Sequence, residues 1–176
     1  RFLDNISNVM AWSHEAPYLY TAVIKTQYEG RFGEYLVLPI GFRSLSFNEG
    51  KMSVNEVPVE LHAAEFAMTS DIATTTEQLR ELKRTGCNAL KIKGGPQLDA
   101  LYELCDRLGL YVINQADVNT SRHGVSRRVG GNPSNDPTWE AAYVDRAVGM
   151  YHASKNHPSV VAFSIAEQSS NGYCLY

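Results

Sequence analysis

The stretch NHPSVVAFSIAEQSSNG, residues 156–172, decides the fold that this sequence can adopt. Polar residues lead into the apolar run 160–165, and the run ends directly in a polar cluster that contains Glu167 and Gln168. A short apolar run between polar segments is typical of a strand that is buried on both faces of a parallel sheet. In a barrel of such strands, the reacting residues lie at the carboxyl ends. The stretch therefore predicts a barrel strand with Glu167 and Gln168 at its functional end.

Strands and helices alternate from about residue 60 onward. Strands are expected at residues 60–66, 88–92, 110–114 and 160–165, and helices at residues 74–85, 98–108 and 137–154. Thr74 is expected to be the N-cap of the first helix, because Glu77 lies at the capping-box distance from it. Gly86 and Gly109 are expected to end the first two helices. This alternation predicts parallel βαβ units.

Four such units allow two α/β folds, the first half of a TIM (β/α)8 barrel or an open doubly wound sheet. No G-x-G-x-x-G or G-x-x-x-x-G-K-[ST] pattern follows an expected strand, which argues against a nucleotide site. Before about residue 60 the pattern differs, with short apolar runs at residues 18–26, 35–40 and 41–47 separated by turn residues. This part predicts antiparallel β structure. It supplies about four strands, where an immunoglobulin-like sandwich needs roughly seven.

The overall composition narrows the classes of function. A hydrophobic share of 44% and a charged share of 20% are ordinary for a globular protein, and the net charge of -3 gives no basic surface for nucleic acid. No apolar run approaches the ~18–20 residues that span a bilayer, so no membrane partner is expected. The chain starts without methionine in the middle of a pattern, which indicates a fragment and leaves its compartment, cytoplasm or periplasm, open.

Several short motifs along the chain occur in the order in which one enzyme family has them. Residues 12–20, WSHEAPYLY, resemble W-S-x-E-x-P-x-L-Y, and residues 41–43 match G-F-R. Val54-Asn55 followed by Pro58-Val59 is similar to N-G-x-P-V-x-L. The runs TGCNA (85–89), LCDRLGLYV (104–112) and NHPSV (156–160) match the helix-to-strand joints. Together these motifs resemble glycoside hydrolase family 2, the β-galactosidase and β-glucuronidase group.

The resemblance implies a domain plan and a chemistry. The family has a sugar-binding β domain, an immunoglobulin-like domain and a catalytic (β/α)8 barrel, so residues 1–50 are expected to end the immunoglobulin-like β-sandwich and residues 51–176 to form the N-terminal half of the barrel. Members are similar to other retaining glycosidases, which use two carboxyl groups about 5–5.5 Å apart, one as acid/base and one as nucleophile. The family's nucleophile lies on a later strand, which is expected to be absent here.

The resemblance also assigns the acid/base position. In the family run S-L-G-N-E-S-G, the asparagine binds sugar and the glutamate is the acid/base. Glu167 takes the asparagine position here and Gln168 takes the glutamate position. An amide cannot donate a proton at neutral pH. Shifting the match by one residue would put Glu167 at the catalytic position, but neighbouring strand residues point to opposite faces, so this alternative needs a bulge.

Other polar positions of the family are also substituted. Lys91 replaces the arginine of N-A-V-R-x-S-H-Y-P, and Asn114 and Gln115 replace the acidic pair of D-E-A, so the resemblance implies substrate-binding positions there. His123 stands at a histidine ligand position, and Asn119 replaces a glutamate that binds magnesium in family β-galactosidases. A hard cation would lose most of its anionic oxygens in such a site. We therefore expect no metal and no other cofactor.

The expected function follows from these substitutions. We expect a β-galactosidase-like homologue of family 2, whose parent family hydrolyses O-glycosyl bonds in carbohydrate metabolism, but a pseudoenzyme without activity in this chain. One alternative is a non-catalytic carbohydrate-binding protein that uses the amides at the strand ends, and another is a structural or assembly fragment without sugar affinity. Open edges of a half barrel invite pairing, so a homo-oligomer is expected. The sequence does not identify the sugar.

Overall fold

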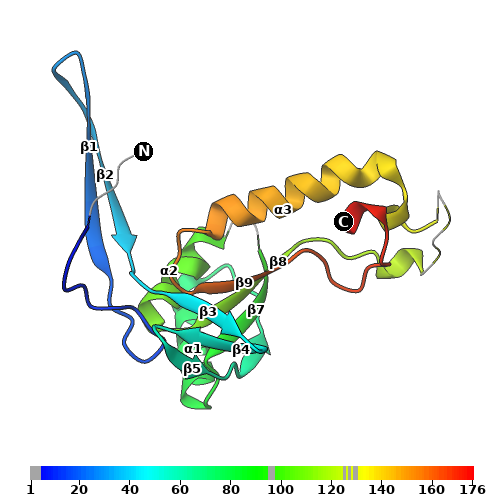
Figure 1. Cartoon of the computed structure of the whole chain (residues 1–176), viewed down its shortest axis with the longest axis horizontal. Coiled ribbons are helices and arrows are strands. Elements are labelled where there is room, and N and C mark those ends of the chain that lie inside the picture. Colours follow the sequence, from blue (N-terminus) through cyan, green and yellow to red (C-terminus); the bar gives the residue numbers. More distant parts are fainter. Residues whose placement is uncertain (1–4, 95–97, 125, 127, 129–130) are drawn as a thin grey trace.

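The computed structural model describes residues 5–94, 98–124, 126, 128 and 131–176. Its centre is a four-stranded parallel sheet with the strand order β6-β7-β8-β9 (Figure 1). These strands span Ala63–Glu65, Ala89–Gly94, Tyr111–Ala116 and Val160–Ser164, respectively. The order follows the chain without a reversal, as in a barrel wall, whereas a doubly wound sheet reverses its order at a switch point. The expectation of the first half of a TIM barrel is confirmed.

Helices connect the parallel strands as the alternation predicted. They are α1 (Ile72–Arg84), α2 (Asp99–Leu108) and α3 (Glu140–Ser154). The expected third helix begins instead with a short 3-10 turn at Pro137–Trp139, which Asp136 caps by accepting a hydrogen bond from the backbone of Thr138 at 3.0 Å. Further 3-10 turns occur at Ser121–His123, Pro133–Asn135 and Tyr173–Leu175.

The N-cap expected for α1 was wrong by three residues. Asp71 is the N-cap, and its Oδ2 accepts a hydrogen bond from the backbone nitrogen of Thr74 at 2.7 Å. A carboxylate at this position satisfies a free N–H and faces the positive end of the helix dipole. Thr74 therefore lies inside the first turn, while the expected stop at Gly86 is confirmed by its φ of 92° just after the helix.

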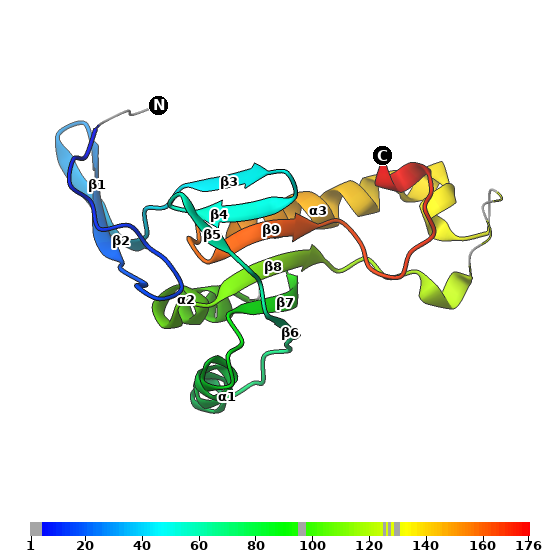
Figure 2. The same cartoon turned by 60° about the horizontal axis from the view of Figure 1, so that its bottom comes forward.

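The first part of the chain is antiparallel, as predicted. Strands β1 (Tyr20–Tyr28) and β2 (Arg31–Ile40) form a hairpin that extends away from the parallel sheet in both views (Figures 1 and 2). A separate sheet has the order β3-β4-β5, with the bounds Leu45–Asn48, Lys51–Val54 and Val57–Val59. The expected domain boundary between residues 50 and 51 falls in the turn between β3 and β4.

The parallel sheet buries different side chains on its two faces. Leu90 and Ile92 of β7 and Val112 of β8 pack against α1 and α2 in one apolar cluster. Ala89 and Tyr111 lie on the opposite, inner face and pack with Trp12 and with β4. Because side chains alternate along a strand, the residues that follow Ala89 and Tyr111 at steps of two also lie on the inner face. This alternation carries Lys91, Lys93 and Gln115 to the carboxyl end of the inner face.

Candidate functional site

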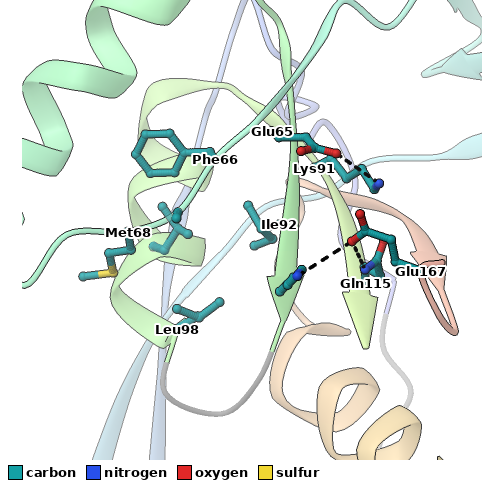
Figure 3. A pocket seen from close by; sticks show the side chains of 11 residues that line it. Glu65, Phe66, Met68, Lys91, Ile92, Leu98, Gln115 and Glu167 are labelled. Carbon is teal, nitrogen blue, oxygen red and sulfur yellow. Dashed lines mark hydrogen bonds and ion pairs between the residues drawn. The ribbon is translucent and has the colours of Figure 1, made fainter. Parts of the chain in front are cut away.

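Polar side chains from neighbouring strands meet at the carboxyl end of the sheet. Glu65 of β6 pairs in register with Lys91 of β7, and Lys93 of β7 pairs with Gln115 of β8. Glu167 follows β9 and joins Gln115 across the end of the sheet (Figure 3). All five residues line one cavity of about 510 Å³. The structure thus brings together Lys91, Gln115 and Glu167, three of the residues that the family resemblance selected.

Glu167 is held by an amide and lies near an ammonium group. Nε2 of Gln115 donates a hydrogen bond to Oε2 of Glu167 at 2.9 Å, and Nζ of Lys93 lies 3.9 Å from the same oxygen. The side chain of Glu167 is 20% exposed. The hydrogen bond from Gln115, with smaller contributions from the charges of Lys91 and Lys93, lowers the pKa of Glu167, although partial desolvation opposes the shift. Glu167 is therefore an ionised acceptor at neutral pH.

Lys91 has a separate partner in the same cavity. Its Nζ lies 3.3 Å from Oε1 of Glu65, whose side chain is 78% exposed. An exposed pair of this kind contributes little to stability, because solvent screens both charges. Lys91 and Lys93 therefore keep N–H groups that a ligand can reach, beside the carboxylate of Glu167.

Gln168 lies outside this cavity. It is exposed, and its φ of 45° is in the left-handed region that side chains other than glycine seldom adopt. The backbone before it is fixed by the loop after β8, because the nitrogen of Glu167 donates to the carbonyl of Val118 at 2.9 Å. Ser169 fixes it further by accepting from the nitrogen of Thr120 at 3.2 Å and donating to the carbonyl of Glu167 at 3.0 Å.

Asn114 faces the helices rather than the cavity. Its Nδ2 donates to Oη of Tyr102 at 2.9 Å and to Oγ of Ser154 at 2.7 Å, and the residue is completely buried. The sequence could have indicated the direction of Asn114, because side chains alternate along β8 and neighbours such as Asn114 and Gln115 must face opposite sides of the sheet. His123 lies in the exposed turn Ser121–His123, outside the cavity.

Sequence reasoning missed several cavity residues. Glu65 and Lys93 could have been predicted from the sequence, because each lies at a strand end on the face that bears Lys91. The apolar side of the cavity carries no comparable signal, since Phe66 and Met68 follow β6 in a segment without regular structure. Only the packing of this segment brings them to the site.

Two features are absent from the described part of the chain. Among those residues, no group of three or more His, Cys, Asp or Glu side chains is arranged to hold a metal ion. None of the helices in the described ranges has the length and apolar character needed to cross a membrane.

Replacing Gln115 by leucine is expected to raise the pKa of Glu167 toward the ordinary value of a glutamate. The change removes the hydrogen bond that contributes most to the lowered pKa, while keeping a side chain of similar size. A carbon-13 NMR titration of labelled glutamate carboxyl groups measures the shift. Gln168→Leu is the matched control, because Gln168 is exposed and lies outside the cavity.

The same change has a consequence for stability. A carboxyl group with a lowered folded-state pKa stabilises the protein above its unfolded-state pKa, and this contribution is lost as the pH falls through the folded-state pKa. As the pH falls below the ordinary pKa of a glutamate, the free energy of unfolding should therefore decrease less in Gln115→Leu than in the unchanged protein. An identical Glu167 titration in both proteins would contradict the role given to Gln115.

The chain matches known proteins along nearly its whole length. It is 33% identical over 169 residues to a β-galactosidase of Vibrio cholerae, an alignment that covers 92% of this chain and 16% of that protein. It is also 33% identical over 181 residues to β-galactosidase BgaC of Bifidobacterium adolescentis, with 95% of this chain and 17% of that protein covered. The chain thus spans 16–17% of the length of these two curated relatives.

Solved structures share the fold. A β-glucuronidase from Ruminococcus gnavus superposes with a TM-score of 0.76 at 20% identity, over 92% of this chain and 28% of that one. A glycosyl hydrolase family 2 member from Bacteroides cellulosilyticus gives a TM-score of 0.69 at 24% identity, over 88% of this chain and 20% of that one. Residues 51–176 match the family model described as glycosyl hydrolases family 2, TIM barrel domain. The chain therefore belongs to glycosyl hydrolase family 2.

Proposed function

We propose that the strand-end site of this chain binds a β-glycoside without cleaving it. The two curated relatives described above are named β-galactosidases, which supports a sugar as the ligand. The proposal depends most on one observation, the hydrogen bond by which Gln115 holds Glu167 in the cavity while an amide occupies position 168.

Proton donation to the leaving oxygen is the step that this site lacks. A retaining glycosidase needs a carboxylic acid whose pKa is raised, so that it still carries a proton at neutral pH. Gln168, at the family's acid/base position, has no such proton. The pKa of Glu167 is shifted in the opposite direction, because its hydrogen bond with Gln115 and the nearby lysines lower it. Neither residue therefore supplies the acid, whichever of the two alignments is used.

Sugar binding needs different properties, which these side chains have. Glu167 accepts hydrogen bonds from hydroxyl groups, the ammonium groups of Lys91 and Lys93 donate them, and the amide of Gln115 can do both. A few polar groups that converge on a concave site are typical of ligand recognition. The polar side of the cavity thus matches a ring that carries hydroxyl groups.

The arrangement of the chain around the site forms part of the same proposal. Residues 1–50 are assigned to the end of an immunoglobulin-like domain, with support from the antiparallel β1–β2 pair. Residues 51–176 are assigned to the half barrel, with support from the family match. Self-association is proposed through β6 and β9, the outer strands of the parallel sheet in the described chain.

Hydrolysis and binding assays on the purified natural protein, in its complete reading frame, test the proposal. We expect no release of nitrophenol from aryl β-galactosides or β-glucuronides above the buffer rate. Methyl β-D-galactoside should bind in a calorimetric or NMR titration. Glu167→Gln should weaken this binding about tenfold or more, since a hydrogen bond to a charged group contributes about 1.5–3 kcal/mol. Gln168→Leu is the matched control and should bind as the unchanged protein does.

Two outcomes would contradict the proposal. Hydrolysis by the unchanged protein that disappears in Glu167→Gln would make Glu167 a working catalytic carboxyl group. Absence of binding to any glycoside would leave only the structural or assembly role. Light scattering on the chain of residues 1–176 tests self-association, which a monodisperse monomer at micromolar concentration would exclude.

A further inference from the structure

The N-terminal segment, residues 12–19, docks on the half barrel through a buried tryptophan. Trp12 is completely buried, and its Nε1 donates to the carbonyl of Asp106 on α2 at 2.8 Å. Its backbone nitrogen donates to the carbonyl of Phe42 at 2.7 Å, which ties the segment to the residues after β2. The hairpin of β1 and β2 follows the segment directly. This contact therefore holds the antiparallel part of the chain on the barrel.

His14 is the residue of this segment whose charge can change near neutral pH. It stands at the open position of the W-S-x-E-x-P motif, so the family resemblance gives it no role. Its Nδ1 lies 3.1 Å from Oη of Tyr111, and the centres of the two rings are 5.0 Å apart. Tyr111 is completely buried and is the first residue of β8, so this contact lies at the end of the sheet opposite to the cavity.

The contact with Tyr111 favours a neutral imidazole. Burial raises the pKa of Tyr111, so its hydroxyl keeps its proton and can donate it to Nδ1 of His14. A proton on Nδ1 would force the buried hydroxyl to accept instead, which takes away the acceptor for its own proton. Two more charges lie near Tyr111: Arg43, which opposes the shift of the Tyr111 pKa, and Asp106, which attracts Arg43.

The surroundings of His14 also disfavour a positive charge. Burial is the largest cause that lowers the pKa of His14. Nζ of Lys83 on α1 donates to the carbonyl of His14 at 2.7 Å, so an ammonium group already faces this residue and repels a second cation. The carboxylate of Glu15 opposes the shift, but Glu15 is exposed and solvent screens its charge. The docked segment therefore holds His14 in its neutral form.

We propose that His14 is a pH-sensitive latch, whose neutral imidazole keeps the N-terminal segment docked on the half barrel and whose imidazolium loosens it in mildly acidic solution. The undocked segment binds a proton more readily than the docked one. Docking therefore weakens as the pH falls below about 6.5, the ordinary pKa of histidine. The latch is independent of the proposed sugar binding, because His14, Tyr111 and Lys83 do not line the cavity.

Hydrogen–deuterium exchange, measured by mass spectrometry on the natural protein in its complete reading frame, tests the latch. Peptides that cover residues 12–19 are followed from about pH 7.5 to about pH 5, the range in which histidine titrates. Each rate is corrected for the intrinsic pH dependence of amide exchange. We expect the protection of this segment to fall with pH, by up to about tenfold per pH unit, because its release takes up one proton. Peptides that cover β8 should keep their protection.

Two variants remove the titrating group, and a third serves as the matched control. His14→Asn keeps an acceptor near the position of Nδ1 but takes up no proton, so the protection of residues 12–19 should no longer depend on pH. His14→Gln is a second variant without a titrating group and should behave in the same way. His62→Asn is the control, because His62 is exposed and lies outside the segment. It should lose protection with falling pH as the unchanged protein does.

A loss of protection that is confined to residues 12–19 and disappears in both His14 variants would establish the latch. Protection of this segment that stays constant down to about pH 5 would overturn the inference. A loss that persists in both variants would overturn it as well, because another group, such as His157 beside Asp106, would then be responsible. An equal loss in β8 would show that acid loosens the whole fold, which would also contradict a local latch.

Discussion

Replacing Asp106 by alanine is expected to lower the free energy of unfolding by about 3 kcal/mol, because a buried charge-assisted hydrogen-bond network loses its acceptor. Asp106 lies on α2 and is 2% exposed. Its Oδ2 lies 2.6 Å from Nδ1 of His157, and its Oδ1 accepts from the nitrogen of Ser159 at 3.0 Å. Without the carboxylate, these two groups keep their burial but lose their partner.

The network around Asp106 joins segments that are distant in the chain. Trp12 is completely buried and donates from Nε1 to the carbonyl of Asp106 at 2.8 Å. Arg43 donates hydrogen bonds to the carbonyls of Pro158 and Val160, the two residues that flank Ser159. The start of β9, helix α2 and the N-terminal part of the chain therefore depend on one another, and the loss should appear in the global unfolding transition.

Urea unfolding followed by circular dichroism measures the effect of Asp106→Ala. Asp106→Asn keeps the shape and one acceptor oxygen, so a smaller loss is expected. Asp145→Ala is the matched control, because Asp145 is exposed on α3 and should change stability by no more than about 0.5 kcal/mol. Equal effects of Asp106→Ala and Asp145→Ala would show that the network does not contribute to folding.

Replacing Gly109 by alanine is expected to cost about 3 kcal/mol of stability, against about 1 kcal/mol for the same change at Gly86, because only Gly109 adds a collision to the left-handed backbone strain. Gly109 follows α2 with a φ of 69°. A Cβ atom there would lie 2.3 Å from the carbonyl oxygen of His14, whereas a Cβ at Gly86, with a φ of 92°, has open space. The carbonyl oxygen of His14 belongs to the backbone, so it cannot rotate out of the way as the tip of a flexible side chain can.

The collision falls on a point where the N-terminal segment docks. Nζ of Lys83 on α1 donates to the carbonyl of His14 at 2.7 Å and to that of Gly109 at 3.2 Å. Burial in this contact lowers the pKa of His14. If Gly109→Ala forces the segment away, the pKa of His14 should rise toward its ordinary value, as NMR titration would detect.

Thermal or urea unfolding of the two glycine variants supplies the comparison. Gly86→Ala controls for the backbone strain alone, since both positions have positive φ and both follow a helix. Equal losses of stability in Gly86→Ala and Gly109→Ala, with an unchanged titration of His14, would contradict the prediction. They would show that the N-terminal segment moves aside without a loss of free energy.

The regular elements were predictable because their signals are local. The apolar runs of β8 and β9 and the glycines after α1 and α2 depend on the periodicity and backbone freedom of neighbouring residues. The N-cap of α1 shows the limit of this reasoning, because Thr74 and Asp71 are both suitable caps by residue type. The backbone placed Asp71 at the cap, and the sequence pattern alone did not distinguish the two.

The site was only partly predictable, for a reason of geometry. Strand alternation separates Gln115 from Asn114 and is readable in principle. The placement of Glu167 and Gln168 is not readable in the same way, because both follow the end of β9. Their directions depend on the loop after β8, through Val118 and Thr120. Such contacts join residues almost fifty positions apart, and no local pattern encodes them.

The order of strands and helices, the parallel half barrel and the family were therefore determined by the amino-acid sequence itself. These properties arise from hydrophobic periodicity, turn residues and motifs that neighbours in the chain specify. Tertiary structure alone decided that Glu167 enters the cavity while Gln168 faces solvent, and that apolar side chains such as Phe66 and Met68 line the same cavity. The physical reason is that these features depend on packing between distant segments, whose free energy is shared among contacts that no single stretch contains.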